Sequence, residues 1–220
     1  MNKIIFTLSL ILCTTFLRSQ NNIEIEIIKK PIVYNQDRIN LSLQYLKDRH
    51  NIIQTEPTIQ PKIIVLHYTA GGTLNSNFNY FNKSRIEGAR EYNKNQSLLN
   101  VSAHYLIDRD GKIYQLISDT LFARHTIGLN YCAIGVENVG SKTEPLTQAQ
   151  VNANAALVRH LKKMYSIKYL IGHYEYGKFR KSKLWKETNS TYFTGKEDPG
   201  SIFMKKVREL ITDLNLKYEP

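Results

Sequence analysis

Short apolar runs along the chain predict strands that are buried in a sheet. Three runs are almost continuously apolar: IIVL at 63–66, AIGV at 133–136 and YLI at 169–171. This pattern is typical of strands that are covered on both faces. The runs lead into His67, into Glu137 and, through Gly172, into His173. Because open sheets bind ligands at the carboxyl ends of their strands, these ends are candidate site positions. Taken alone, a histidine such as His67 is also common as a hydrogen-bonded, half-buried residue.

An alternating segment predicts a β-hairpin between the first two runs. Residues 101–108 alternate in polarity, with His104 on the more polar face. The DG pair at 110–111 is a turn signal, and residues 112–116 form the returning strand. Residues 23–34 alternate more loosely, which predicts an edge strand or an extended leader.

Helical spacing of apolar residues separates these strands. It recurs over residues 36–49, around Phe78 and Phe81, over 147–164, and from 201 to 214. The third helix opens with TQAQ, a capping-box signature. The expected inner faces are Ile39, Leu43 and Leu46 in the first helix and Phe203, Val207, Leu210 and Leu214 in the last. Residues 84–100 are polar and Asn-rich, which predicts a surface loop. The mixed order predicts a single α/β domain with a mixed central β-sheet flanked by helices.

Composition adds an export signal to this picture. The chain has 220 residues, of which 42% are hydrophobic, enough for one domain with a sizeable core. Residues 1–20 carry an early lysine, an apolar run and a polar end, which predicts a secretory signal too short for a membrane span. Leu12 before Cys13 argues against a lipid anchor, because a lipoprotein signal has a small residue there. We expect an exported protein, periplasmic or extracellular, with no transmembrane segment after signal removal.

The remaining chain divides into an N-terminal leader with one helix at 21–61 and the main domain at 62–220. Removal of the signal leaves Cys132 as the one thiol, so no internal disulfide is expected. The net charge of +11 favours anionic partners such as nucleic acid, anionic lipid or an acidic cell-wall polymer. The same charge is equally consistent with a role in solubility alone.

Two histidines and an aspartate form a candidate metal site. His67 and His173 are too far apart in the sequence for a local zinc-finger pair, and Asp198 lies in a rigid Asp-Pro-Gly turn before the last helix. Two imidazoles and one carboxylate with an open fourth position are what a catalytic zinc needs. By spacing alone this is a weak signal, because most α/β proteins have such residues at strand ends.

Motifs in these same places resemble a known family. The segments are IVLHYTAG at 64–71, VSAHYLIDRDG at 101–111, AIGVE at 133–137, IGH at 171–173 and KEDPG at 196–200. In this order they resemble the zinc-dependent N-acetylmuramoyl-L-alanine amidases of the type 2 class, whose fold is shared with peptidoglycan recognition proteins. The resemblance runs from about residue 62 to residue 214, so it makes residues 62–220 an amidase domain.

The resemblance implies a role for each site residue. It implies Zn²⁺ as cofactor, with His67, His173 and Asp198 as ligands, Glu137 as general base and Lys196 as the cation that stabilises the oxyanion. The implied reaction cleaves the amide between the lactyl group of N-acetylmuramic acid and L-alanine. The implied partners are peptidoglycan or muropeptides, with no nucleic acid, and we expect a monomer. The alternative is a non-catalytic peptidoglycan-binding module on the same fold, which would commonly have lost a ligand.

Other residues admit two interpretations. His104 is predicted to form a wall of the site or to support it, against a plain surface position. His125 lies where the family usually carries a histidine near the substrate, with Arg124 in place of the common aromatic residue before it. Glu175 is expected to orient His173 or, less favoured, to compete for the metal. Cys132 is expected to be a small buried hydrophobe.

One departure from the family is the long segment between His173 and Asp198, where a short loop is usual. It interleaves basic and aromatic residues: Lys178, Arg180, Lys181, Lys183 and Lys186 with Trp185, Tyr192 and Phe193. Such a mixture is seen in nucleic-acid binders. Beside a zinc cleft it predicts a wall of the substrate groove, against the alternative of a solvated loop. The insert also puts the position of Lys196 in doubt.

Overall fold

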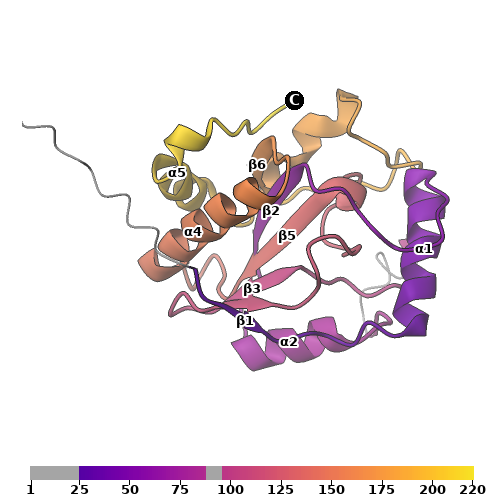
Figure 1. Cartoon of the computed structure of the whole chain (residues 1–220), viewed down its shortest axis with the longest axis horizontal. Coiled ribbons are helices and arrows are strands. Elements are labelled where there is room, and N and C mark those ends of the chain that lie inside the picture. The colour runs from indigo at the N-terminus through magenta and orange to yellow at the C-terminus, as the bar shows by residue number, and fades with distance from the viewer. Residues whose placement is uncertain (1–24, 88–95) are drawn as a thin grey trace, which may run out of the picture.

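A six-stranded mixed sheet forms the centre of the molecule (Figure 1). The structure is a computed structural model that describes residues 25–87 and 96–220. The strands are β1 (Ile27–Lys29), β2 (Ile63–Tyr68), β3 (Tyr105–Ile107), β4 (Ile113–Gln115), β5 (Ala133–Asn138) and β6 (Tyr169–Gly172), in the order β1-β4-β3-β5-β2-β6. Only β3 and β4 pair antiparallel, as the predicted hairpin. The predicted α/β class with a mixed central sheet is confirmed.

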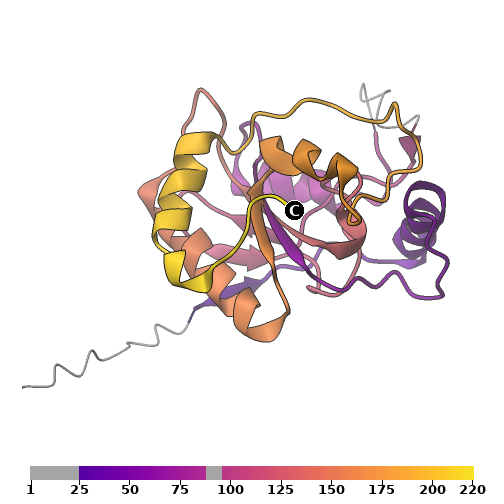
Figure 2. The same ribbon diagram turned by 90° about the horizontal axis from the view of Figure 1, so that it is seen from above.

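Helices cover both faces of this sheet. The α-helices include α1 (Gln36–His50), α2 (Leu74–Asn82), α4 (Gln148–Met164) and α5 (Ser201–Glu209), and three short 3₁₀ segments are η1 (Asn130–Cys132), η2 (His173–Lys181) and η3 (Thr212–Leu214). Figures 1 and 2 show α4 and α5 together on one side and α1 at the opposite end of the molecule. The core residues agree, because α4 and α5 pack on one sheet face while α2 and η2 pack on the other.

The pleat of β2 decides which side chains meet the site. Successive strand residues point to opposite faces. Ile64 and Leu66 pack with α4 and α5, whereas Ile63 and Val65 pack with η2. All four are fully buried. His67 therefore follows Ile63 and Val65 onto the face opposite α4 and α5.

The N-terminal segment is part of the same fold. β1 pairs parallel with β4 at one sheet edge. In α1 the fully buried residues include Tyr45 and Leu46, which pack with Phe122. The predicted inner face of this helix was partly wrong, because Ile39 and Leu43 are only half-buried. The helix is rotated so that Arg38 lies inside, where its Nη2 donates to the carbonyls of residues 81 and 83.

Several local predictions are confirmed and others need correction. Thr147 and Gln150 form the predicted capping box at the start of α4. α5 ends at Glu209, and Leu210, predicted as an inner residue, is 45% exposed because the helix stops before it. The predicted signal at 1–20, Cys13 and part of the loop at 84–100 lie outside the described residues. Within 25–87 and 96–220, no helix is long and apolar enough to cross a membrane.

Candidate metal centre and cleft

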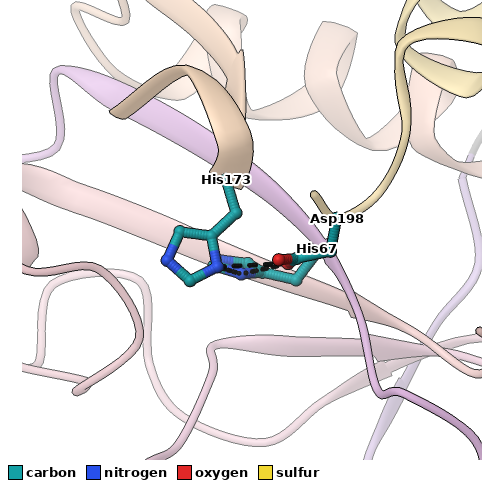
Figure 3. A group of neighbouring side chains, drawn as sticks. All are labelled: His67, His173 and Asp198. Atoms are coloured by element: carbon teal, nitrogen blue, oxygen red, sulfur yellow. Dashed lines mark hydrogen bonds and ion pairs between the residues drawn. The ribbon is translucent and has the colours of Figure 1, made fainter. Parts of the chain in front are cut away.

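Three side chains from distant segments converge at the carboxyl end of the sheet. His67 Nδ1 lies 3.0 Å from His173 Nδ1 and 3.2 Å from Asp198 Oδ2, and His173 Nδ1 lies 3.1 Å from the same oxygen (Figure 3). All three residues are buried. In the part of the chain that the structure describes, these three are the group of His, Cys, Asp and Glu side chains placed to hold a metal ion.

Strand register brings the first two together. β2 lies between β5 and β6 and is parallel to both. Leu66 is opposite Gly172, so His67 and His173 each take the next position along adjacent strands. Asp198 arrives from the segment before α5, and the Tyr174 N–H donates to its carbonyl at 3.0 Å.

Hydrogen bonds indicate which ring nitrogen of His67 carries a proton. His125 Nε2 lies 3.2 Å from the carbonyl of Ala133, which can only accept, so His125 carries its proton there. His125 Nδ1 is then an acceptor, with the Thr126 hydroxyl 2.8 Å away and His67 Nε2 3.2 Å away. This arrangement favours a proton on His67 Nε2, which leaves the lone pair of Nδ1 toward His173 and Asp198. A metal-binding histidine is normally held in this way by a partner on its other nitrogen.

Burial favours the neutral form of two imidazoles at this site, those of His173 and His125. It lowers the pKa of His173 to about 4, and the neighbouring His67 adds to that effect. It also lowers the pKa of His125 well below its ordinary value. Burial alone would raise the pKa of Asp198, but the contacts of its carboxylate with the His173 and His67 rings outweigh burial and hold the pKa well below the ordinary value. At neutral pH His173 is therefore a neutral imidazole and Asp198 a carboxylate, the forms in which these two groups bind a metal.

The donor set fits a zinc ion. Two neutral imidazole nitrogens facing each other at 3.0 Å have opposed lone pairs unless a cation or a proton lies between them. Around a tetrahedral zinc with bonds of about 2.0–2.1 Å, ligand atoms lie about 3.3 Å apart. The three separations of 3.0, 3.1 and 3.2 Å are close to that value. Three protein ligands leave one position for water or substrate, as in catalytic zinc sites.

Glu137 and Lys196 face the same cavity, whose volume is about 500 Å³. Glu137 is opposite His67 in the β2–β5 register, on the same sheet face. It is half-buried, whereas Lys196 is exposed at the rim. The insert has therefore not moved Lys196 away from the cleft.

His125 lines the cavity and is made possible by a glycine. A Cβ atom at residue 135 would come within 2.6 Å of the His125 ring, so Gly135 lets the imidazole lie flat against β5. The structure thus places His125 against a candidate metal ligand as well as on the cleft wall.

His104, predicted to form a wall of the site or to support it, lies behind the cleft wall. His104 does lie on the sheet face that carries the site, but it is fully buried and does not line the cavity. Its Nε2 donates to the carbonyl of Leu121, and its Nδ1 accepts from the Gly135 N–H at 3.0 Å. The His125 ring lies 5.9 Å away between centroids, on the cleft side. His104 holds β5 and the loop at 121–125 together.

Glu175 and Cys132 also have structural surroundings. The Glu175 carboxylate accepts from the Gly172 N–H at 2.8 Å and pairs with Arg208 of α5, so it fixes the turn after β6 and does not reach the metal cluster. Cys132 is a buried free thiol whose pKa burial raises to about 12, in agreement with the predicted inert role.

The basic insert does not form the groove wall as predicted. Lys178, Arg180, Lys181, Lys183 and Lys186 are exposed, and none of them lines the cavity. Tyr192 and Thr194 do line it, and they come from the aromatic part of the insert. The aromatic side chains are packed inside with η2, and the basic ones surround that core, with Lys178 near Glu219 and Arg180 over the Phe193 ring.

Sequence reasoning missed several cleft residues. Asn77 and Tyr80 of α2 line the cavity, as do Ser102 and Asn130. Arg124, noted only as a departure from the family, is buried there and donates to Tyr192 Oη at 3.1 Å. Nothing in the local sequence marks these residues, because they meet only through the packing of separate loops.

Comparisons with known proteins agree with this site. The sequence profile of the N-acetylmuramoyl-L-alanine amidase family matches residues 57–201, which is more than half of the chain. A similar curated protein is peptidoglycan recognition protein 3 of Mus musculus, 25% identical over 100 residues. The match covers 44% of this chain and 28% of the mouse protein's length.

Solved structures show the same fold. The endolysin N-acetylmuramoyl-L-alanine amidase LysCS from Clostridium intestinale URNW has a TM-score of 0.50 at 18% identity, with 87% of this chain and 97% of that chain covered. The bumblebee protein PGRP-SA has a TM-score of 0.52 at 16% identity, with 89% and 99% covered. At these identities the likeness concerns the fold.

Proposed function

This chain belongs to the N-acetylmuramoyl-L-alanine amidase family, and we propose that it is a zinc-dependent hydrolase of peptidoglycan. The bond cleaved is the amide between the lactyl group of N-acetylmuramic acid and L-alanine. The observation that carries the proposal is the buried cluster of His67, His173 and Asp198 in the same cavity as Glu137. A recognition surface alone has no need of three converging metal ligands with a carboxylate beside them.

Each residue has a task in this reaction. A bound zinc ion would polarise the substrate carbonyl and lower the pKa of its water to about 7. Glu137 takes a proton from the attacking water and passes it to the leaving amine. Lys196 places its ammonium group at the cleft rim, where negative charge develops on the carbonyl oxygen. His125 holds the His67 proton on Nε2, which keeps Nδ1 free to bind the metal.

A second candidate function is peptidoglycan binding without catalysis. It is favoured by the curated relative, whose name is that of a recognition protein. The complete ligand set and the placement of Glu137 favour the enzyme. Both functions would use peptidoglycan or muropeptides as the partner, and both fit export under a signal at 1–20, action outside the cytoplasm and a monomer.

One experiment separates the two functions. The mature protein is incubated with purified sacculi, and the released ends are identified by mass spectrometry. An amidase releases stem peptides with a free L-alanine amino terminus and leaves unsubstituted lactyl groups, whereas a binding module releases neither.

Metal analysis of the same preparation tests the cofactor. We expect about one zinc per chain, lost on substitution of His67, His173 or Asp198 by alanine. Protein that holds no zinc when purified without chelator, and takes none up afterwards, would remove the mechanism.

A further inference from the structure

The candidate ligand Asp198 sits on a long segment without regular secondary structure. From residue 182 to residue 200, between η2 and α5, the chain contains no helix or strand. Strand pairing positions His67 and His173, but no such pairing positions Asp198. Apart from the backbone bond between the Tyr174 N–H and the Asp198 carbonyl, side-chain contacts hold the returning limb of the insert, residues 192–198.

Tyr176 of η2 contacts both this limb and the metal cluster. Its hydroxyl donates to the Thr194 carbonyl at 2.5 Å and accepts from the Thr194 N–H at 3.0 Å. The ring is 1% exposed, with its centroid 5.3 Å from that of His173. It also stacks at 5.1 Å on Phe193, the residue before Thr194. One side chain thus links His173, the candidate ligand at the start of η2, to the limb that carries Lys196 and Asp198.

Tyr176 also packs against the first part of the insert, residues 182–187, which we call the outgoing limb. The Trp185 ring stacks on the Tyr176 ring, with 5.9 Å between the ring centroids. A Cβ atom at residue 128 would come within 2.6 Å of the Trp185 ring, so Gly128 allows close contact with the loop that carries His125. The Lys186 N–H donates to the Gly128 carbonyl at 3.1 Å. Through these contacts, the stacked rings of Tyr176 and Trp185 are joined to the loop that carries His125, on the opposite wall of the cleft.

Other contacts to the limb lie farther from Asp198 in the sequence or are exposed. Arg124 donates to Tyr192 Oη at 3.1 Å, at the opposite end of the limb. Tyr68 Oη donates to Glu197 Oε1 at 3.0 Å, and Lys142 pairs with the same carboxylate, but the Glu197 side chain is 63% exposed. Exposed pairs of this kind contribute little. The backbone bond from Tyr174 to Asp198 fixes the carbonyl and leaves the carboxylate direction undetermined.

We propose that Tyr176 is the positioning residue that sets Asp198 for metal binding, through its paired hydrogen bonds with the Thr194 backbone. The insert then acts as a brace that fixes the last ligand, in place of the short loop that would do so directly. This inference rests on the proposed zinc site. Partners that orient metal ligands typically change metal affinity by about 10- to 100-fold when they are removed.

The test is Tyr176→Phe, which keeps the stacked ring and removes both hydrogen bonds to Thr194. We expect zinc affinity, measured by competition with a chromogenic chelator, to fall about 10- to 100-fold. The visible spectrum of the Co²⁺-loaded protein should change as well, because the third ligand is no longer held in place. Both measurements are independent of activity.

Tyr131→Phe is the matched control. Tyr131 packs against the same cluster, and its hydroxyl donates at 2.9 Å to the carbonyl of Leu184, on the outgoing limb. We expect zinc affinity and the Co²⁺ spectrum to stay at wild-type values. Equal losses in both variants would overturn the inference, because any loosening of the cluster would then suffice.

Three further outcomes complete the test. Wild-type affinity in Tyr176→Phe, or a variant that is unfolded even without metal, would overturn the positioning role. A wild-type protein that binds no zinc would instead overturn the proposed function, so the two failures are distinguishable.

Discussion

At the scale of single residues, Glu137 is the sharpest point of the mechanism. It faces the cavity beside His67 and is not one of the three candidate metal ligands. Glu137→Gln keeps the shape of the side chain and cannot accept a proton. We expect turnover of sacculi to fall about a hundred- to ten-thousand-fold, the usual cost of losing a positioned general base.

Zinc content and sacculus binding of Glu137→Gln should stay near those of the wild type, since the metal and the substrate use other groups. This pattern distinguishes a base from a ligand, because substitution of His173 should remove metal and activity together. If Glu137→Gln cleaves sacculi within a few-fold of the wild-type rate, the base lies elsewhere.

A second residue-scale prediction concerns His50, which is far from the metal cluster. It is buried between Tyr45, Phe122 and Tyr131, and burial lowers its pKa to about 4. In the unfolded chain the pKa of His50 has its ordinary value of about 6.5. Between that pH and about 4, His50 is therefore protonated in the unfolded state and neutral in the folded state. Stability is therefore lost as the pH falls from about 6.5 to about 4. By linkage, His50 accounts for about 2 kcal/mol of loss between pH 7 and pH 5.

Urea unfolding of His50→Phe at both pH values measures this contribution. Phenylalanine suits the aromatic surroundings and cannot titrate. We expect the loss of unfolding free energy between pH 7 and pH 5 to be smaller than in the wild type by about 2 kcal/mol, both proteins being kept in chelator. An unchanged difference would show that His50 is protonated in the folded state.

His104 shows how far a residue could be predicted from the sequence. The alternation in residues 101–108 gave the correct sheet face. It could not show that the loop around His125 covers that face, because the loop comes from a later segment whose path depends on close packing at Gly135. Burial by a distant loop has no local signal.

At the scale of elements, the capping box of α4 was readable because all its atoms belong to four consecutive residues. Thr147 Oγ1 accepts from the Gln150 N–H at 3.1 Å and donates to the Arg109 carbonyl at 2.8 Å. It thus joins the helix start to the hairpin turn. We expect Thr147→Ala to lower the unfolding free energy by about 1–2 kcal/mol.

Chemical denaturation measures the effect, and Thr147→Ser is its control. Serine keeps the oxygen and should retain most of the stability, so a loss as large as that of alanine would assign the effect to the methyl group. Activity should change little, since α4 covers the sheet face away from the cleft.

The face of α1 was harder to predict than its extent. The helix covers nearly the range that the apolar spacing gave, but its inner side includes the charged Arg38. The guanidinium is accommodated because backbone carbonyls at residues 81 and 83 accept from it. A hydrophobicity pattern cannot anticipate a buried charge whose partners come from another helix end.

At the scale of the whole molecule, the mixed sheet followed from the apolar runs. The group of His67, His173 and Asp198 was expected only through the family resemblance, because spacing does not show that β2 and β6 are neighbours. The insert did not follow, because its basic and aromatic residues alternate in sequence yet separate in space. Trp185 and Tyr192 turn inward, and the lysines remain outside. Composition correctly indicated that the insert contains both basic and aromatic residues. It did not show that the aromatic side chains, rather than the basic ones, lie toward the cleft.

This separation changes the prediction for Arg180, Lys181 and Lys183. These three residues lie outside the cavity, and their charges are screened by salt. Replacing all three by glutamine should therefore leave kcat/KM on soluble muropeptides within about two-fold of the wild type. Retention on intact anionic sacculi should instead fall at about 0.01 M salt, where the Debye length is about 30 Å, and recover its wild-type value near 0.15 M, where it is about 8 Å. Co-sedimentation across that salt range measures retention.

The control is glutamine at the exposed Lys47, Lys163 and Lys168, which gives the same change in net charge elsewhere on the surface. Equal losses in both triple variants would mean that only the total charge of +11 matters. A rise in KM on soluble muropeptides for the insert variant alone would return these residues to the substrate groove.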